Sequence, residues 1–486
     1  MRKVLLILGL ALLPLAALAH VNSPDVFYDA YAGPYHLLVT VRPAPVVPGV
    51  AQIEIRSADD SVEQIKIVPL RMLGAGANLA PVPDLARRDS RDPRLFNGKL
   101  WLMDRGSWKV QVEVQGKKGR GELAVPVPAV STNSARMQKT LGGILGLLGL
   151  VLFAGFVSII GAAARDGELA PGETPGPAQR RRGYARAVIA AAIAIGALLL
   201  GNAWWGAEAA ANAAMNYKLP HLQASLQAGN RLRLQLENPN RPAPNRFKIE
   251  PPDRLVLTDL VPDHGHIMHL FLVSMPEMKI FWHLHPSQEG QGQFTADLPT
   301  MPAGRYQIYA DIVHSTGFPE TQVGAMDMPA VSGAKLKGDD SGFSGTASSS
   351  NVAQLSDGDR MVWERDAAPL KAGQPIWFRF RVEDKNGNPV HDLENYMGMA
   401  GHAAFISSDG KVFAHIHPAG SVPMAAVTIA ESGMQNSGGM AGMERSPTSA
   451  EVSFPYGFPR AGEYHLFVQI KRAGKVETGA FLARAE

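Results

Sequence analysis

The chain carries HLFLV at residues 269–273 and FWHLHP at 281–286, and the pattern returns as HAAFI at 402–406 and FAHIHP at 413–418. Short apolar runs rich in aromatic and β-branched residues, with turns between them, are typical of β-strands. The order and spacing of the stretches are nearly equal in the two copies, which indicates an internal duplication. We therefore predict a β-sandwich that occurs twice.

A third shared segment supports the duplication. The stretch PAGRYQIY at 302–309 corresponds to RAGEYHLF at 460–467, and each is predicted to be a turn that enters a late strand. We place repeat 1 at residues 208–330 and repeat 2 at 352–486. The Gly-, Ser- and Asp-rich stretch between them, residues 331–351, is predicted to be a flexible linker.

Residues 20–133 also read as strands, for example YHLLVTV at 35–41 and WKVQVEV at 108–114. Alternating apolar and polar residues with turns between the strands favour an antiparallel Ig-like sandwich. The predicted fold class is therefore mainly β: three Ig-like β-sandwich domains plus a signal peptide and two transmembrane α-helices.

The membrane topology follows from charge and apolar length. Residues 1–19 have a basic start, an apolar core and a small-x-small end, as in a cleavable signal peptide, although an uncleaved anchor is the alternative. Residues 141–164 and 187–207 carry no charge and are long enough to cross a membrane as helices. The Arg-rich loop 165–186 is predicted to be cytoplasmic. We expect a bacterial inner-membrane protein with both large regions in the periplasm.

Composition excludes several classes of function. The chain has no cysteine, so disulfides, thiolate metal sites and cysteine nucleophiles are excluded. Its formal net charge is only +3 and there is no basic stripe, so we expect no nucleic-acid partner. Any metal must be bound by histidine, methionine or carboxylate side chains.

Each copy carries a His-x-His motif on a predicted strand. Residues i and i+2 share one face of a strand, so His283 and His285 project together, as do His415 and His417. An antiparallel neighbour would bring a third imidazole beside each pair. Those third histidines are His269 in repeat 1 and His402 in repeat 2. Three imidazoles on one patch suit copper, with zinc as the alternative.

The flanks of the two copies differ. His264 and His266 of repeat 1 fall where repeat 2 has Met397 and Met399. Thioethers suit Cu(I), so we include all four as candidate ligands for copper in both oxidation states. On a regular strand the upstream pair would face away from His269, so the pair joins the site only through a bend or bulge. Further methionines follow the second His-x-His: Met424, Met434, Met440 and Met443.

A separate site is predicted at the mature N-terminus. Signal removal would leave His20 with a free α-amino group, and the amine and imidazole of one residue can chelate Cu(II). His36, at the start of a predicted strand, would complete a two-histidine brace. We interpret two other histidines, His314 and His465, as structural.

The segment Ala19-His20-Val21 before a small Ig-like sandwich resembles the periplasmic copper-resistance carriers of the CopC type and the related YcnI-like proteins. That resemblance implies a copper-binding sandwich with His20 as a ligand. The later His-and-Asp ligand pattern of those proteins is not evident, so no further residue is carried over. The two C-terminal repeats, with their Ala-Gly-x-Tyr turns, are similar to the YtkA-like and FixH-like periplasmic domains, another copper-associated group.

Three classes of function remain open. The leading hypothesis is a periplasm-facing metal-binding protein, a copper carrier, sensor or assembly factor with a periplasmic or inner-membrane protein partner. A non-catalytic Ig-like scaffold of a membrane complex is the alternative, and it would leave the rings of His269, His283 and His285 scattered. A metal-dependent enzyme fits less well, because a (β/α)₈ barrel needs about 250 residues with alternating helices, and neither repeat is that long.

Overall fold

The computed structural model describes residues 25–74, 76–77, 79–135, 137–237, 257–333, 335–366, 368–432 and 449–486. The predicted signal peptide, His20, Met434, Met440 and Met443 lie outside these residues. The chain divides into two compact units. The first comprises the described residues of Met1–Val130 together with Lys218–Glu486, and the second is Ser131–Tyr217.

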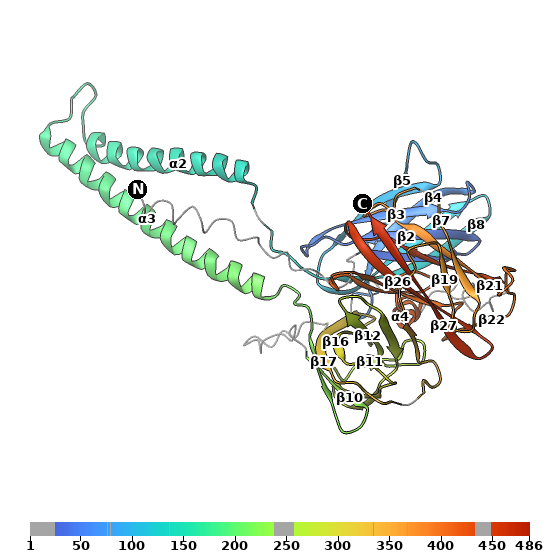
Figure 1. Cartoon of the computed structure of the whole chain (residues 1–486). Coiled ribbons are helices and arrows are strands. Elements are labelled where there is room, and N and C mark those ends of the chain that lie inside the picture. The colour runs from blue at the N-terminus through green and yellow to red at the C-terminus, as the bar shows by residue number, and fades with distance from the viewer. Residues whose placement is uncertain are drawn as a thin grey trace. The chain divides into compact units, whose positions relative to one another are not determined.

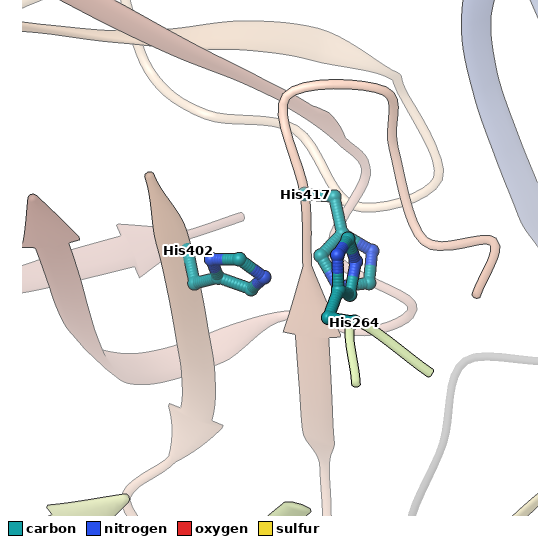
Figure 2. A group of neighbouring side chains, drawn as sticks. All are labelled: His264, His402 and His417. Atoms are coloured by element: carbon teal, nitrogen blue, oxygen red, sulfur yellow. The ribbon is translucent and has the colours of Figure 1, made fainter. Parts of the chain in front are cut away.

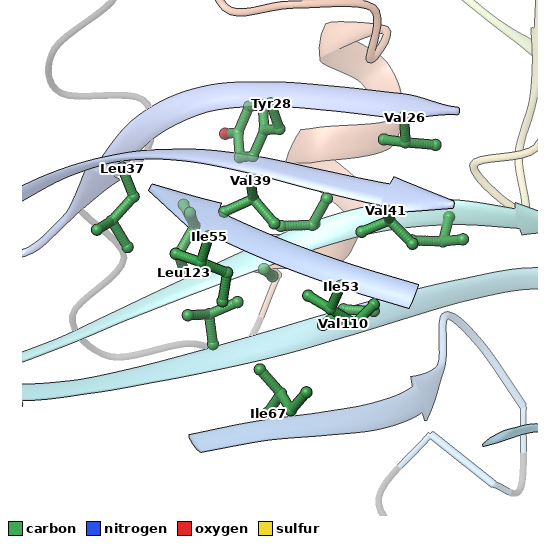
Figure 3. Close-up of a cluster of buried hydrophobic side chains, with 14 of the residues drawn as sticks. Val26, Tyr28, Leu37, Val39, Val41, Ile53, Ile55, Ile67, Val110 and Leu123 are labelled. Carbon is green, nitrogen blue, oxygen red and sulfur yellow. The ribbon is translucent and has the colours of Figure 1, made fainter. Parts of the chain in front are cut away.

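The chain is mainly β, as the sequence predicts, and Figure 1 labels many of its strands. The N-terminal domain has eight antiparallel strands in the order β1-β2-β3-β6-β5-β4-β7-β8. Their bounds are β1 (Val26–Ala32), β2 (Tyr35–Arg42), β3 (Gly49–Ser57), β4 (Val62–Arg71), β5 (Asp84–Arg88), β6 (Leu95–Leu102), β7 (Gly106–Gly116) and β8 (Gly119–Ala129). Alternate residues such as Val110 and Val112 in β7 face a core shared with β2 and β3, part of which Figure 3 shows.

The second unit consists mainly of two long helices, α2 (Lys139–Asp166) and α3 (Pro177–Ala214). Both are long and apolar enough to cross a membrane, as the sequence predicts. Figure 1 shows them side by side, and they approach closely where Gly161 meets Gly183. Each helix extends beyond the predicted apolar segment. Helix α3 begins at Pro177, ten residues before the predicted start at Ala187.

Repeat 1 contains two antiparallel sheets. One has the order β14-β15-β10-β9, and the other has the order β11-β16-β12-β13-β18 with β17 paired to β16. The bounds are β9 (Leu222–Leu226), β10 (Arg231–Leu236), β11 (Leu260–Val261), β12 (His269–Met275), β13 (Ile280–Leu284), β14 (Ser287–Gly290), β15 (Gln293–Asp297), β16 (Gly304–His314), β17 (Pro319–Met328) and β18 (Ser341–Ser344).

Repeat 2 repeats this plan with the orders β19-β20-β21-β25 and β22-β26-β23-β24, the latter with β27 paired to β26. The bounds are β19 (Val352–Gln354), β20 (Arg360–Glu364), β21 (Ile376–Glu383), β22 (Leu393–Glu394), β23 (His402–Ser407), β24 (Phe413–Ile416), helix α4 (Met424–Glu431), β25 (Glu451–Tyr456), β26 (Gly462–Arg472) and β27 (Lys475–Ala485). The histidine-bearing strands β12 and β13 correspond to β23 and β24 in both order and pairing.

The segment between the repeats differs from its predicted form as a flexible linker. Residues 341–344 form β18, which extends the sheet of repeat 1 by pairing with β13. The pairing places Phe343 opposite Phe281. Local Gly, Ser and Asp content predicts a loop, but the free edge of β13 offers backbone hydrogen bonds that such a segment can complete.

Repeat 2 is joined to the N-terminal domain through α4. Ala426, Val427 and Ala430 of this helix are buried in the same apolar core as the strands of the N-terminal domain. The loop before α4 also contacts β1, because the backbone N–H of Asp29 donates to the carbonyl of Ala419 at 2.8 Å. The C-terminal side of the second His-x-His motif is therefore covered by protein.

Candidate metal centre

A tight turn precedes the first histidine-bearing strand of each repeat. In repeat 1, Asp263 and His266 exchange backbone hydrogen bonds of 2.8 and 3.0 Å, and the central residues His264 and Gly265 have φ values of 50° and 86°. These values are those of a type I′ turn. This turn supplies the bend that a regular strand lacks, and it directs His264 and His266 toward the other histidines.

Repeat 2 has the same turn at the equivalent place. Tyr396 and Met399 exchange backbone hydrogen bonds, and Met397 has a φ of 51°. The two turns touch, because the Nδ1–H of His264 donates to the carbonyl of Met397 at 2.8 Å. The repeats therefore meet at equivalent points.

The histidine-bearing strands are buried on both faces. In β12, Leu270 and Leu272 face the core of repeat 1, whereas Phe271 and Val273 belong to a cluster that also contains residues of repeat 2. His269 lies on the same face of β12 as Phe271 and Val273, so it faces repeat 2. The same alternation directs His283 of β13 and His415 of β24 to this interface.

The interface between the repeats is reciprocal. Phe281 of repeat 1 stacks on Phe467 of repeat 2 with ring centroids 4.3 Å apart, and Phe413 of repeat 2 stacks on Tyr309 of repeat 1 at the same distance. These four residues occupy equivalent places in β13 and β24 and in β16 and β26. The repeats thus meet face to face in the manner of an isologous dimer, within one chain.

At one end of this interface eight histidines form a single group, which we name the histidine cluster. Neighbouring ring centroids are 3.8 Å apart for His266 and His285, 4.6 Å for His415 and His417, and 4.9 Å for His264 and His402. Its members are His264, His266, His269, His283, His285, His402, His415 and His417. Every histidine that the sequence predicts as a ligand within the repeats is in this cluster.

The first triad consists of His264, His402 and His417, whose ligand nitrogens all lie within 4.8 Å of one another. Figure 2 shows the three rings turned toward one another from separate segments. The Nδ1–H groups of His264 and His417 donate to the carbonyls of Met397 and Val422. Each Nε2 is thereby left as the lone-pair nitrogen, the arrangement that orients metal-binding histidines.

The second triad consists of His269, His283 and His415. His269 Nε2–H donates to the carbonyl of Asp263 at 3.2 Å, and His283 Nδ1–H donates to Gln469 Oε1 at 2.9 Å. The remaining nitrogens of these two rings then face each other as lone pairs, 3.1 Å apart. Two nitrogens about 2.0 Å from one metal ion have about this separation when the angle between them is about 100°.

The site leaves many buried nitrogens without a hydrogen-bond partner. Within the described residues, six ring nitrogens of the histidine cluster are in this state: Nε2 of His264, His285, His415 and His417, and both nitrogens of His402. Buried polar groups are rarely unpaired in folded proteins, because desolvation without a partner costs free energy. A bound cation would supply the missing interaction.

Burial also sets the protonation of the cluster. Desolvation, followed by the neighbouring imidazoles, holds the pKa values of His269, His283, His402 and His415 well below the usual value of 6.5. Desolvation and His264 have the same effect on the pKa of His417. The rings are therefore neutral near pH 7, and protons compete little with a metal ion for them.

Two residues that the sequence analysis did not select as ligands orient the second triad. Gln469 faces His283, and Asp311 Oδ2 lies 3.4 Å from His415 Nδ1, each across the interface between the repeats. Their places are equivalent, because Gln469 pairs with His402 between β26 and β23, and Asp311 pairs with His269 between β16 and β12. Burial raises the pKa of Asp311 to about 7, against the opposing hydrogen bond from Thr321. Their equivalent positions after the Ala-Gly-x-Tyr turns were the available signal.

The structure groups the ligands differently from the expectation. The sequence predicts one trio in each repeat, His269 with His283 and His285, and His402 with His415 and His417. Both observed triads instead combine residues of the two repeats. His285 lies outside both triads, with its Nδ1 3.0 Å from Asp340 Oδ1. Its ring stacks on that of His266, whose Nε2 is 3.4 Å from Asp339 Oδ2. A period of two identifies the face of a strand but not the surface that covers it.

The methionines lie in other surroundings. Met399 belongs to the apolar core of the N-terminal domain, and Met424 packs against that core. Met397 is buried and offers its carbonyl to His264. Met399 and Met424 therefore pack in an apolar core, and Met397 contributes a backbone carbonyl to the turn of His264.

His36 lies on β2 of the N-terminal domain. Its Nε2 is 2.7 Å from Asp29 Oδ1, and its ring stacks on Tyr31. The hydrogen bond to Asp29 raises the pKa of His36. The proposed partner His20 lies outside the described residues, so the two-histidine brace stays a prediction.

Comparisons with known proteins add little to this geometry. Residues 225–324 and 353–486 match the model of a family described as a domain of unknown function, DUF8832. A comparison with curated proteins found no match. The match includes most of both repeats and every residue of the histidine cluster.

Among solved structures, the chain is similar to a 1.5-MDa bacterial ice-binding adhesin, with 5% identity, a TM-score of 0.16, and 90% of each chain covered. It is also similar to a tetra-tandem repeat of a large adhesion protein, with 9% identity, a TM-score of 0.17, and 90% of this chain and 96% of that chain covered. It is also similar to E. coli alpha-2-macroglobulin, with 9% identity, a TM-score of 0.20, and 96% of this chain and 23% of that chain covered. TM-scores this low carry no argument about fold or function.

Proposed function

We propose that this chain is a copper-binding protein and that the histidine cluster between its two repeats holds up to two ions, one in each triad. The observation that carries the proposal is the set of six buried ring nitrogens without partners, four of which belong to the first triad. Their convergence supports a metal site over a scaffold with incidental histidines, for which the rings would be scattered.

The donor set favours copper. The triads offer imidazole nitrogens, and for such donors affinity rises toward Cu(II) and falls again at Zn(II). Low proton competition at neutral pH helps binding further. Zinc remains the second candidate, because three imidazoles also form tetrahedral zinc sites with an open fourth position.

We also propose the setting of this activity. The two apolar helices would anchor the chain in the bacterial inner membrane, and a cleaved signal peptide would place the Ig-like domains in the periplasm. There the protein would act as a copper carrier, sensor or assembly factor with a protein partner, in line with its resemblance to CopC-type, YcnI-like, YtkA-like and FixH-like proteins. Reporter fusions at residue 170 and at the C-terminus should give opposite compartments, and the same compartment for both would contradict this topology.

The metal proposal is tested on the detergent-solubilised full chain. We expect close to two copper ions per chain after loading and removal of free metal, measured by elemental analysis. The double variant H402A/H415A removes one ligand from each triad and should hold two copper ions fewer than the parent, while its circular dichroism stays that of the parent. The control H391A removes an exposed histidine outside the cluster and should bind as the parent does. Equal loading of both variants would overturn the assignment.

A further inference from the structure

One edge of the histidine cluster reaches the surface. The side chain of His266 is 29% exposed, whereas that of His285 beneath it is 4% exposed and His283 is fully buried. The rings of His266 and His285 stack at 3.8 Å, and His285 lies 4.7 Å from His283 of the second triad, centroid to centroid. Imidazoles therefore form a continuous series from solvent to the buried ligands.

Two carboxylates stand at this edge. Asp339 Oδ2 lies 3.4 Å from His266 Nε2, and Asp340 Oδ1 lies 3.0 Å from His285 Nδ1. Both are about one-third exposed, and Lys471 reaches Asp339 only at 3.9 Å. A pair of partly exposed negative charges beside a narrow opening attracts cations and raises their rate of association.

The buried member of this group is incompletely bonded. Asp340 accounts for Nδ1 of His285, but its Nε2 is buried and has no hydrogen-bond partner. A purely structural His–Asp pair would leave that nitrogen exposed to water or bonded to protein. An unpaired lone pair directly beneath a partly exposed imidazole is suited to receive a cation from it.

The equivalent edge in repeat 2 is closed. Met399 stands where repeat 1 has His266, and it is buried in the core of the N-terminal domain. His417, the equivalent of His285, donates to the carbonyl of Val422 in the loop before α4. Helix α4 and the N-terminal domain therefore cover this side of the cluster, and the two edges differ in access.

We propose that His266, His285, Asp339 and Asp340 form a loading port through which a copper ion passes to the second triad. The proposal rests on the copper-binding function proposed above. It assigns these four residues to capture and transfer of the ion, and the two triads to its retention.

The test measures the rate of Cu(II) loading into the full chain by stopped-flow spectroscopy, together with the final copper content. Variants H266A and D339N should load about 10-fold more slowly at low ionic strength, as expected when a steering charge or first contact is lost, and reach the parent's final copper content. Added salt should reduce the difference for D339N. The matched controls are D327N, an exposed carboxylate paired with Arg305, and H391A, and both should load at the parent rate.

The possible results are distinct. Parent-like loading rates for H266A and D339N would overturn the port, even if copper binds. A lower final copper content in H266A would also overturn it, because His266 would then be a retaining ligand. A parent chain that binds no copper would instead refute the function on which the port rests.

Discussion

Repeat 1 and repeat 2 share the strand order of their histidine-bearing sheets and meet through equivalent residues, yet they differ where the histidine cluster is built. Repeat 1 has His264 and His266 in its type I′ turn, and repeat 2 has Met397 and Met399 in the same turn. Asp311 of repeat 1 corresponds to Gln469 of repeat 2. The comparison teaches that a symmetric scaffold can hold an asymmetric site, with one edge open to solvent and the other closed by the N-terminal domain.

The largest expected effect comes from breaking the symmetric part. F281A removes a ring from the Phe281–Phe467 stack and F413A removes its counterpart from the Tyr309–Phe413 stack. Each should lower the free energy of unfolding by about 3–5 kcal/mol, the usual cost of a Phe to Ala change in a core. Urea denaturation followed by tryptophan fluorescence measures this. A large effect in only one of the two variants would show that the stacks are not equivalent.

The next effect separates the two triads. H283A removes a ligand of the second triad, and H417A removes one of the first. Each variant should weaken the affinity for one copper ion by more than about 100-fold, since loss of even an orienting partner costs up to this factor. The other copper ion should stay tightly bound. Competition titration with a chromophoric chelator measures both. If either variant loses both ions, the triads act as one inseparable site.

A third comparison concerns the last residue of the central strand in each repeat. His314 bonds Asp259 and lies near Glu320, whereas Arg472, at the equivalent place in repeat 2, bonds Asp392 and Asp359. Burial opposes protonation of His314, but the two carboxylates outweigh it and raise its pKa to about 9. Because this pKa is above the unfolded value, the stabilisation is complete below about pH 6.5 and is lost as the pH rises through 9.

We therefore expect repeat 1 to lose about 2 kcal/mol of local stability between pH 7 and pH 10, while repeat 2 does not. Hydrogen exchange at β11 and β16 against β22 and β26, corrected for intrinsic rates, measures the difference. H314Q should remove this pH dependence, and H221Q, which changes an exposed histidine, should keep it. Equal pH profiles for the two repeats would contradict the assignment.

The smallest effect concerns the groups that orient the second triad. Q469L removes the acceptor of His283 Nδ1–H and should weaken the affinity of the second triad for its copper ion by about 10-fold, as loss of an orienting partner usually does. The affinity of the first triad should be unaffected, which the same chelator competition measures. Parent-like affinity for both ions in Q469L would mean that the hydrogen bond does not orient the ligand.

Much of the scaffold was predictable. Apolar alternation and the repeated stretches predicted the mainly β architecture, and the two uncharged apolar runs predicted the two long helices. The period of two grouped His283 with His285 and His415 with His417, and these rings lie 4.7 and 4.6 Å apart, centroid to centroid. The type I′ turn that brings in His264 had a local signal in the following Gly265, because such turns favour glycine at positive φ. The sequence analysis required a bend or bulge at this place, and the turn provides it.

The assembly of the site was not predictable from local pattern. Nothing in the period of two reveals that His283 faces Gln469 across another domain, because the strand pattern is the same whether the face meets solvent, its own sheet or a second repeat. Asp339 and Asp340 were hidden for a similar reason. They lie in a Gly- and Ser-rich segment that reads as a linker, and only pairing of β18 with β13 brings them to His285.

The central claim is that imidazoles of both repeats share each metal ion. Crystals of the full chain soaked in copper, with anomalous differences measured at the copper absorption edge, test it most directly. We predict one peak among His264, His402 and His417 and a second among His269, His283 and His415. No peak between the repeats, or peaks whose ligands all come from one repeat, would contradict the account.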